Sequence, residues 1–159
     1  MKNIEEDSLR EKYLTFLIDN QNYGIEIKYI TEIISMQKII QVPDLPDYIK
    51  GIINLRGRVI PLIDIRIRFK KEPIEYSNKT SIIVIDIIGK YIGLIVDCVN
   101  EVITISDNDI SESSIINEGF INRYVKGFGK IGNNIVLMID CEKILTYEEL
   151  INIGKTSDM

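Results

Sequence analysis

Residues 48–64 have the sequence YIKGIINLRGRVIPLID, and residues 124–140 have the sequence YVKGFGKIGNNIVLMID. Both stretches open on Tyr-x-Lys-Gly and close on a run of apolar residues before an Asp, at an offset of 76 residues. In each, two apolar runs flank a short central turn, a pattern that favours a β-hairpin. A chain that carries the same hairpin twice is expected to contain two copies of one small β-unit.

A second pair of similar stretches lies upstream of these hairpins. Residues 23–34 (YGIEIKYITEII) align with residues 92–103 (IGLIVDCVNEVI) at an offset of 69 residues, with Gly and Glu in matching places. The two blocks occur in the same order in both copies, which indicates an internal duplication. The difference between the offsets predicts an insertion in the second copy, and we expect it in the polar stretch 106–117.

Short strands are expected to account for most of each copy. Apolar runs bounded by turn residues predict them at residues 13–18, 22–27, 50–55, 59–63, 80–88, 91–96, 125–131 and 135–139. Residues 29–34 fit either a short helix or another strand. Asp64 and Asp140 are each placed to cap a short helical turn. Thr146 begins a capping box, which predicts a short C-terminal helix that ends near Ile153.

The composition supports a mostly β fold and excludes several kinds of chemistry. Of the 159 residues 36 are Ile and none is Ala, which favours strands over helices. The absence of His excludes a Ser-His-Asp triad and imidazole metal ligands. Cys98 and Cys141 do not have the spacing of a zinc site, so we expect two buried free thiols. The glycines of residues 127–132 lie on a predicted hairpin and do not indicate dinucleotide binding. We therefore expect no enzyme activity, no metal and no cofactor.

The chain is expected to act in the cytoplasm. Residues 1–12 are rich in charge and lack the apolar core of a signal peptide. Residues 81–99 are the most apolar stretch, but Asp86, Lys90 and Asp97 interrupt them, so we expect no insertion into a membrane.

The two copies differ at the turn of the hairpin. Leu55 aligns with Ile131 and belongs to the shared scaffold, whereas Arg56 takes the place of Gly132. Arg56 is either a solvated charge or a donor that orders a carboxylate or docks a partner, and Glu32 is its candidate partner in the chain. The turn opens a basic run, which we interpret as the charged face of a short helix rather than a nucleic-acid surface. This run consists of Arg56, Arg58, Arg66, Arg68, Lys70 and Lys71.

Apolar residues occupy equivalent positions near the end of the upstream block. Ile30 and Ile33 in the first copy correspond to Val99 and Val102 in the second. A two-fold relation between the copies would place all four at a seam between two small barrels. They are either ordinary core or an exposed groove that accepts an amphipathic helix.

Residues 48–69 closely resemble the bacterial chemotaxis coupling proteins of the CheW family. The hallmark G-x-x-N-L-R-G-x-x-x-P is matched by Gly51, Asn54, Leu55, Arg56, Gly57 and Pro61. The likeness extends over residues 12–150. It implies one domain, 1–150, of two SH3-like five-stranded barrels, about 12–75 and 76–150, which may exchange terminal strands. A tail, 151–159, would follow.

The resemblance also implies a function without catalysis. Members of this family join the cytoplasmic hairpin tip of a chemoreceptor to the regulatory domain of the histidine kinase CheA, within membrane-associated receptor arrays. Arg56 is the arginine of the motif, and Glu32 is the acidic residue associated with it. The receptor-binding groove maps onto Leu14, Ile27, Ile30, Ile33, Val99 and Val102. Two alternatives stay open, a module for another signalling kinase and a barrel that binds a ligand or nucleic acid.

Overall fold

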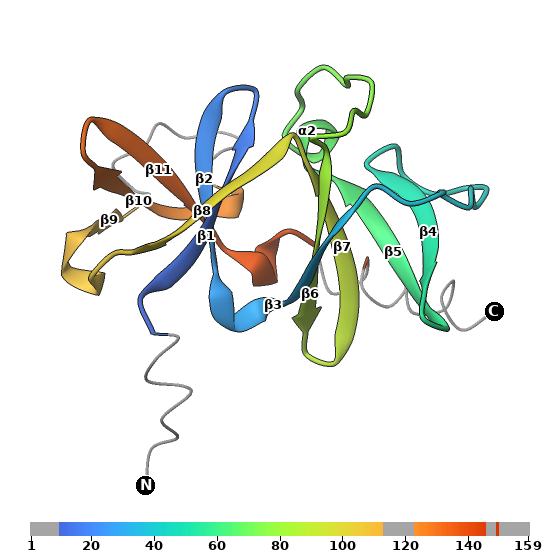
Figure 1. The fold of residues 1–159 in the computed structure, drawn as a ribbon, viewed down its shortest axis with the longest axis horizontal. Helices are drawn as coiled ribbons and strands as arrows, with labels where there is room; N and C mark the ends of the chain where they lie inside the picture. The colour runs from blue at the N-terminus through green and yellow to red at the C-terminus, as the bar shows by residue number, and fades with distance from the viewer. Residues whose placement is uncertain (1–9, 113–122, 146–148, 150–159) are drawn as a thin grey trace, which may run out of the picture.

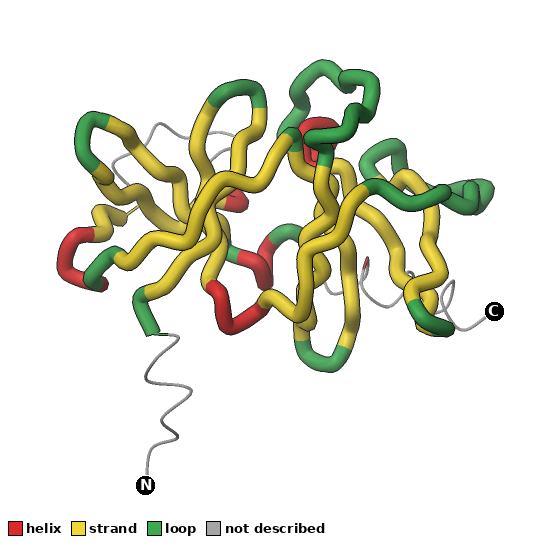
Figure 2. The backbone as a smooth tube through the Cα atoms, in the orientation of Figure 1, coloured by secondary structure: helices red, strands yellow, loops and turns green. Residues whose placement is uncertain are grey.

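The computed structural model describes residues 10–112, 123–145 and 149. Strands dominate these residues, as predicted (Figure 2). Residues 29–34, which fitted a helix or a strand, belong to a 3-10 turn and to the strand that follows it. Only Glu149 of the predicted C-terminal helix lies within the described residues. The elements are β1 (Lys12–Ile18), β2 (Gln21–Glu26), η1 (Ile27–Tyr29), β3 (Ile30–Ser35), β4 (Ile49–Leu55), β5 (Arg58–Asp64), α2 (Ile65–Arg68), β6 (Ser81–Ile87), β7 (Lys90–Val96), β8 (Cys98–Thr104), η2 (Asp107–Asp109), β9 (Ile110–Glu112), β10 (Val125–Ile131), β11 (Asn134–Ile139) and η4 (Cys141–Lys143).

The strands form two sheets that lie side by side (Figure 1). The first has the order β8-β1-β2-β11-β10-β9, and the second has the order β3-β6-β7-β5-β4. One parallel pair stands in each sheet, β2 with β11 and β5 with β7. The mostly β fold of two SH3-like units is confirmed, but the first sheet has six strands because the short β9 joins it. Within the described residues the outer strands of a sheet do not pair with each other, so neither barrel closes.

Each sheet combines strands from both copies of the repeat. Strands β1 and β2 of the first copy lie with β8, β10 and β11 of the second, and β6 and β7 of the second lie with β3, β4 and β5 of the first. The chain crosses between the sheets at η1 and again at Asp97. The expected division at residues 75 and 76 falls between two strands of the five-stranded sheet. The extent of the domain, 1–150, and the tail, 151–159, stay predictions.

The glycines of the Tyr-x-Lys-Gly motif explain why the repeat is so visible. A Cβ atom on Gly51 would lie 2.3 Å from the carbonyl oxygen of Ile40, and one on Gly127 would lie 2.4 Å from that of Ser111. Only glycine allows this close approach of two backbones. Because Ile40 and Ser111 are 71 residues apart, the extra residues of the second copy fall on both sides of Ser111.

Both predicted capping residues are confirmed. The Asp64 carboxylate accepts a hydrogen bond from the Ile67 N–H, 3.3 Å from it, and the Asp140 carboxylate accepts one from the Glu142 N–H at 3.1 Å. The equivalence of the two caps is further evidence of the duplication.

The largest core cluster joins the two sheets. Phe16 and Tyr23 of the six-stranded sheet stack with ring centroids 6.0 Å apart, and the series continues through Phe69 to Tyr124 at 5.5 and 5.3 Å. Fully buried residues of the five-stranded sheet, such as Ile63, complete this cluster. The two sheets therefore pack on each other through a common core and are not independently folded units.

The basic run was interpreted as the charged face of a short helix. The short helix is present as α2, but its two arginines are buried and do not form an exposed charged face. Arg66 and Arg68 are each 8% exposed. Arg66 Nη1 lies 2.6 Å from Asp97 Oδ2, and the Arg68 guanidinium lies 4.1 and 5.2 Å from the ring centroids of Tyr48 and Tyr124. These partners come from distant parts of the sequence, so the local charge pattern does not reveal them.

Candidate functional site

The turn between β4 and β5 holds an arginine in a strained backbone conformation. Arg56 has a φ of 53° and Gly57 a φ of 85°, the two positive values of a type I′ turn. The Asn54 side-chain oxygen accepts a hydrogen bond from the Gly57 N–H at 2.9 Å and so supports the turn. The equivalent of Arg56 in the second copy, Gly132, has a φ of 59°. The chain therefore keeps an arginine where its own repeat uses the residue that fits without strain.

Arg56 forms an ion pair with Glu32, so the structure brings these two predicted residues together. Arg56 Nη2, in the β4–β5 turn, contacts Glu32 Oε1 on β3. The Arg56 side chain stays 69% exposed, and that of Glu32 is 30% exposed. The carboxylate therefore orients the guanidinium, whose remaining N–H groups face solvent and are free to donate to a partner.

A surface pocket of about 300 Å³ lies beside this ion pair. Leu55, the apolar residue of the motif, forms part of its wall. Arg58 and Tyr91 close one side, with the guanidinium 3.8 Å from the ring centroid. Tyr91 was not predicted as a site residue, because it meets Arg58 through the parallel pairing of β5 with β7, which the sequence does not reveal.

We call the six predicted groove residues the apolar seam. Three of them, Ile27, Ile30 and Val99, lie beside the two crossovers, and the others lie further along β1, β3 and β8. Leu14 is buried, whereas Ile27, Ile30 and Val99 are half-buried against the same inter-sheet core. The other two project further, since Ile33 is 45% exposed and Val102 is 55% exposed. The apolar seam consists of Leu14, Ile27, Ile30, Ile33, Val99 and Val102.

The apolar seam follows the two-fold relation between the copies. Ile33 lies opposite Ile83 in the pairing of β3 with β6, and Val102 lies opposite Leu14 in the pairing of β8 with β1. Strands β3 and β8 are each the outermost strand of their sheet. Two exposed β-branched side chains therefore stand at equivalent places on the edges of the two sheets, and Leu14 lies beside one of them on the neighbouring strand.

A carboxylate lies at the start of the first crossover. Burial by itself raises the pKa of Glu26, but its bonds to Lys126 and Lys28 outweigh this and hold the pKa below the usual 4.5. Lys28 Nζ lies 3.3 Å from Glu26 Oε2, and Lys126 contacts the other carboxylate oxygen. Glu26 therefore ties the crossover to β10 as an ion.

Both cysteines lie within the described residues. Cys141 is buried and Cys98 is half-buried, and both thiols are free. Among residues 10–112, 123–145 and 149 there is no cluster of three or more side chains suited to a metal ion. The helices in this part of the chain are all too short to cross a membrane.

Comparisons with known proteins cover most of the chain. Residues 12–149 match the family model of the CheW-like domain. The chemotaxis protein CheW of Klebsiella aerogenes is 30% identical over 144 residues, which cover 91% of this chain and 87% of that protein. That of Bacillus subtilis is 32% identical over 138 residues, 87% of this chain and 88% of that protein.

A solved structure shares the fold. The crystal structure of the scaffolding protein TtCheW from Thermoanaerobacter tengcongensis matches with a TM-score of 0.77 and 34% identity, and the match covers 82% of this chain and 88% of that one. The family model, the relatives and the solved structure all match most of the chain. This chain belongs to the family of proteins built on the CheW-like domain.

Proposed function

We propose that this protein is a non-catalytic adaptor of chemotaxis, which couples the cytoplasmic tip of a chemoreceptor to the histidine kinase CheA. Its relatives are chemotaxis proteins, and one of them is described as a scaffolding protein. The observation that carries the proposal is the pair of exposed apolar residues, Ile33 and Val102, at equivalent positions on two sheet edges. Each would be covered when a partner binds.

The apolar seam is proposed as the receptor-binding surface. A helical hairpin presents apolar residues three and four apart, and such a stripe fits an apolar surface about two strands wide. Covering the exposed halves of Ile33 and Val102 contributes about 1 kcal/mol for each side chain, before the cost of association. Leu14 is the direct cross-strand neighbour of Val102, so it packs beside Val102 and continues the seam into the core.

The β4–β5 turn is proposed as the element through which the kinase is regulated. Glu32 holds the Arg56 guanidinium in one orientation, and its free N–H groups suit a carboxylate or carbonyl oxygen of the kinase regulatory domain. The strain at Arg56 supports this assignment, because a glycine would suffice for the turn alone. The kinase and the receptor would then use different parts of the molecule.

Single contacts of this size favour weak and reversible binding. We propose that the protein works in the cytoplasm and is recruited to receptor arrays, where many such contacts act together. Receptor state would reach the kinase as a coupling free energy between the two surfaces. The alternative of a nucleic-acid surface is disfavoured, because the two central arginines of the basic run are buried.

The proposal is tested by measuring the binding of each partner to matched variants. Ile33→Asp is expected to lose binding to a receptor hairpin fragment while it keeps binding to the CheA regulatory domain. The control is Ile74→Asp, since Ile74 is 46% exposed on a loop outside the apolar seam, and it should bind both partners. Ile30→Asp is expected to behave like Ile33→Asp if it folds. Equal loss of both partners in the folded Ile33→Asp variant would contradict the assignment of the seam to the receptor.

A further inference from the structure

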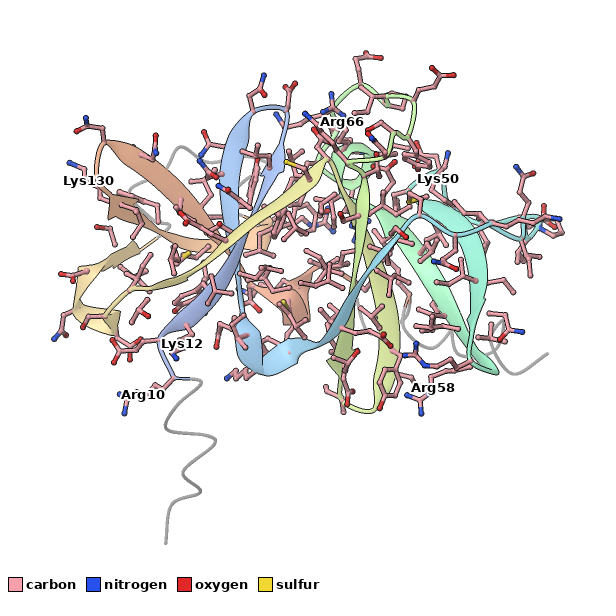
Figure 3. The ribbon with its side chains drawn as sticks, in the orientation of Figure 1. Arg10, Lys12, Lys50, Arg58, Arg66 and Lys130 are labelled. Carbon is pink, nitrogen blue, oxygen red and sulfur yellow. The ribbon has the colours of Figure 1, made fainter. Side chains whose placement is uncertain are left out.

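The short helix α2 connects the two sheets through its side chains. It directly follows β5 of the five-stranded sheet and carries both buried arginines of the basic run. Each of these arginines reaches a partner outside the five-stranded sheet, and Figure 3 shows Arg66 where the two sheets meet. The helix is therefore placed to hold one sheet against the other.

Arg66 binds the second crossover and a turn of the six-stranded sheet. Its Nη1 atom contacts Asp97, at which the chain crosses between the sheets, and its Nη2 atom lies 3.5 Å from Oδ1 of Asp19 in the β1–β2 turn. The Asp97 carboxylate also accepts a hydrogen bond from the Asp19 N–H at 2.8 Å. The Nε–H of Arg66 donates to the carbonyl oxygen of Glu72 at 2.9 Å. One guanidinium thus joins the segment after β5, the crossover and the six-stranded sheet.

Arg68 binds across the two-fold relation between the copies. Its guanidinium lies over Tyr48 and Tyr124, the tyrosines that open the repeated Tyr-x-Lys-Gly motif. The Nε–H donates to the carbonyl oxygen of Ile144 at 2.9 Å, and Nη2 lies 2.9 Å from Oε1 of Glu149. At the offset of 76 residues, Ile144 is the counterpart of Arg68 itself. Arg68 therefore bonds to its own equivalent in the other copy.

The second copy has no arginine at these positions. Glu142 and Ile144 take the places of Arg66 and Arg68 around the 3-10 turn η4, although both copies share the capping aspartate. The capped turn itself therefore does not require an arginine. Burial lowers the pKa of Arg68, which shows that a charge in this place is costly. A rigid guanidinium gives directional contacts, whereas the apolar contacts of the core are not directional.

The apolar seam draws on both sheets. Val99 and Val102 belong to β8 of the six-stranded sheet, whereas Ile33 belongs to β3 of the five-stranded sheet. The spacing between these side chains therefore depends on how the two sheets are placed. The β4–β5 turn lies within one sheet, so its geometry does not depend on the other sheet.

We propose that α2 is an inter-sheet clamp, in which Arg66 and Arg68 fix the angle between the two sheets and so set the spacing of the apolar seam. Both are positioning residues, because they are buried and act through the sheets. A partner that spans a preorganised seam does not have to order the sheets when it binds. The effect on receptor binding rests on the function proposed above, whereas the clamp itself does not.

The clamp is tested without a partner, by the distance between spin labels on the two sheets. Lys90→Cys on β7 and Asn133→Cys in the β10–β11 turn place one exposed label on each sheet. Cys98→Ser removes the half-buried thiol from this background, and Cys141 is too buried to be labelled. Double electron–electron resonance then gives the distribution of distances between the sheets.

The substitution Arg68→Met should broaden this distribution. Arg68→Lys should broaden it as well, because lysine keeps the charge but lacks the planar fork, and it serves as the test if Arg68→Met does not fold. The matched control is Arg58→Met, which removes an arginine that stacks on Tyr91 within one sheet. The control should keep the narrow distribution of the wild type.

Titration calorimetry on Arg68→Lys tests the effect on the seam. Binding of a receptor hairpin fragment should weaken about 3- to 10-fold, because the fragment then has to order the two sheets. Binding of the CheA regulatory domain should stay at the wild-type level. Unchanged distance distributions in the folded Arg68 variants, or broader distributions with unchanged receptor binding, would overturn the proposal. If the wild type bound neither partner, the proposed function would fail and the distance distributions would still decide whether the clamp exists.

Discussion

Arg56→Gly separates the strain at the β4–β5 turn from its proposed role in kinase regulation. The left-handed conformation costs an L-residue about 1–2 kcal/mol, which glycine avoids. Against this stand the loss of a largely exposed ion pair with Glu32, about 0.2–1 kcal/mol, and the greater freedom of glycine in the unfolded chain, about 0.5–1 kcal/mol. These contributions nearly cancel. The free energy of unfolding should therefore stay within about 1 kcal/mol of wild type, a shift of at most about 4 °C in Tm.

Binding to the kinase should respond differently. A charge-assisted hydrogen bond from Arg56 to the kinase contributes about 1.5–3 kcal/mol, so its removal should weaken binding about 10- to 100-fold. Urea denaturation followed by circular dichroism gives the stability, and titration calorimetry with the CheA regulatory domain gives the affinity. Arg56→Asp should also weaken kinase activation in a folded protein, since it reverses the charge beside Glu32.

The reciprocal variant Gly132→Arg is the matched control. It puts arginine into the left-handed turn of the second copy, where the φ is 59°. Because the strain of about 1–2 kcal/mol is partly offset by the lost freedom of glycine in the unfolded chain, we expect it to lose about 0–1.5 kcal/mol of stability and to leave kinase binding unchanged. If Arg56→Gly loses more than about 2 kcal/mol of stability, Arg56 is structural and the reasoning is wrong. Unchanged kinase affinity in a folded Arg56→Gly variant would refute the functional assignment equally well.

Three further predictions concern the scaffold. Gly51→Ala should lower the free energy of unfolding, measured by urea denaturation, by at least about 3 kcal/mol, because the new Cβ meets a carbonyl oxygen at 2.3 Å. Gly57→Ala has open space around it and should lower it by only about 1 kcal/mol. Equal losses would contradict the close-approach argument. Arg66→Met should lower the free energy of unfolding by about 3–5 kcal/mol, because Asp97 is left without its main cation, and a loss below about 1 kcal/mol would show that the pair contributes little. The pKa of Glu26 is lowered in the folded protein, so its contribution to stability is present above about pH 4.5 and is lost as the pH falls through the lower, folded value. Glu26→Gln should therefore lose less stability below pH 4.5 than the wild type does. Identical acid denaturation curves for the two proteins would count against the ion pairs.

The fold class was readable because the duplication leaves matching residues at positions that tolerate little change. Gly51 and Gly127 allow backbone to approach backbone, and Asp64 and Asp140 cap the turns that follow. Alternating apolar residues predicted eight of the eleven described strands, but β3 was left open between helix and strand, and β8 and β9 were missed. The pattern did not show which strands pair, because the partners of a parallel pair such as β5 and β7 lie on different copies. The exchange of hairpins between the sheets, and β9 as a sixth strand, appeared only in the structure.

The candidate site was readable in part for the same reason. Arg56 stood out because its counterpart is a glycine, and the seam residues stood out because they repeat. Their exposure did not follow from the sequence, since Leu14 and Val102 are both apolar but one is buried and the other half-exposed. The burial of Arg66 and Arg68 was missed because their partners are distant in sequence. The exposure of Ile88, which is 85%, was not predicted either, because this residue continues an apolar run that ends only at the turn.

The central claim is that one molecule holds the receptor tip and the kinase at the same time through separate surfaces. The most direct measurement is co-elution in size-exclusion chromatography with light scattering, using the CheA regulatory domain and a receptor hairpin fragment from the same organism. The account predicts a complex with each partner alone and a three-component complex when all are mixed. Displacement of the kinase domain by the receptor fragment, or binding of neither to the folded protein, would contradict it.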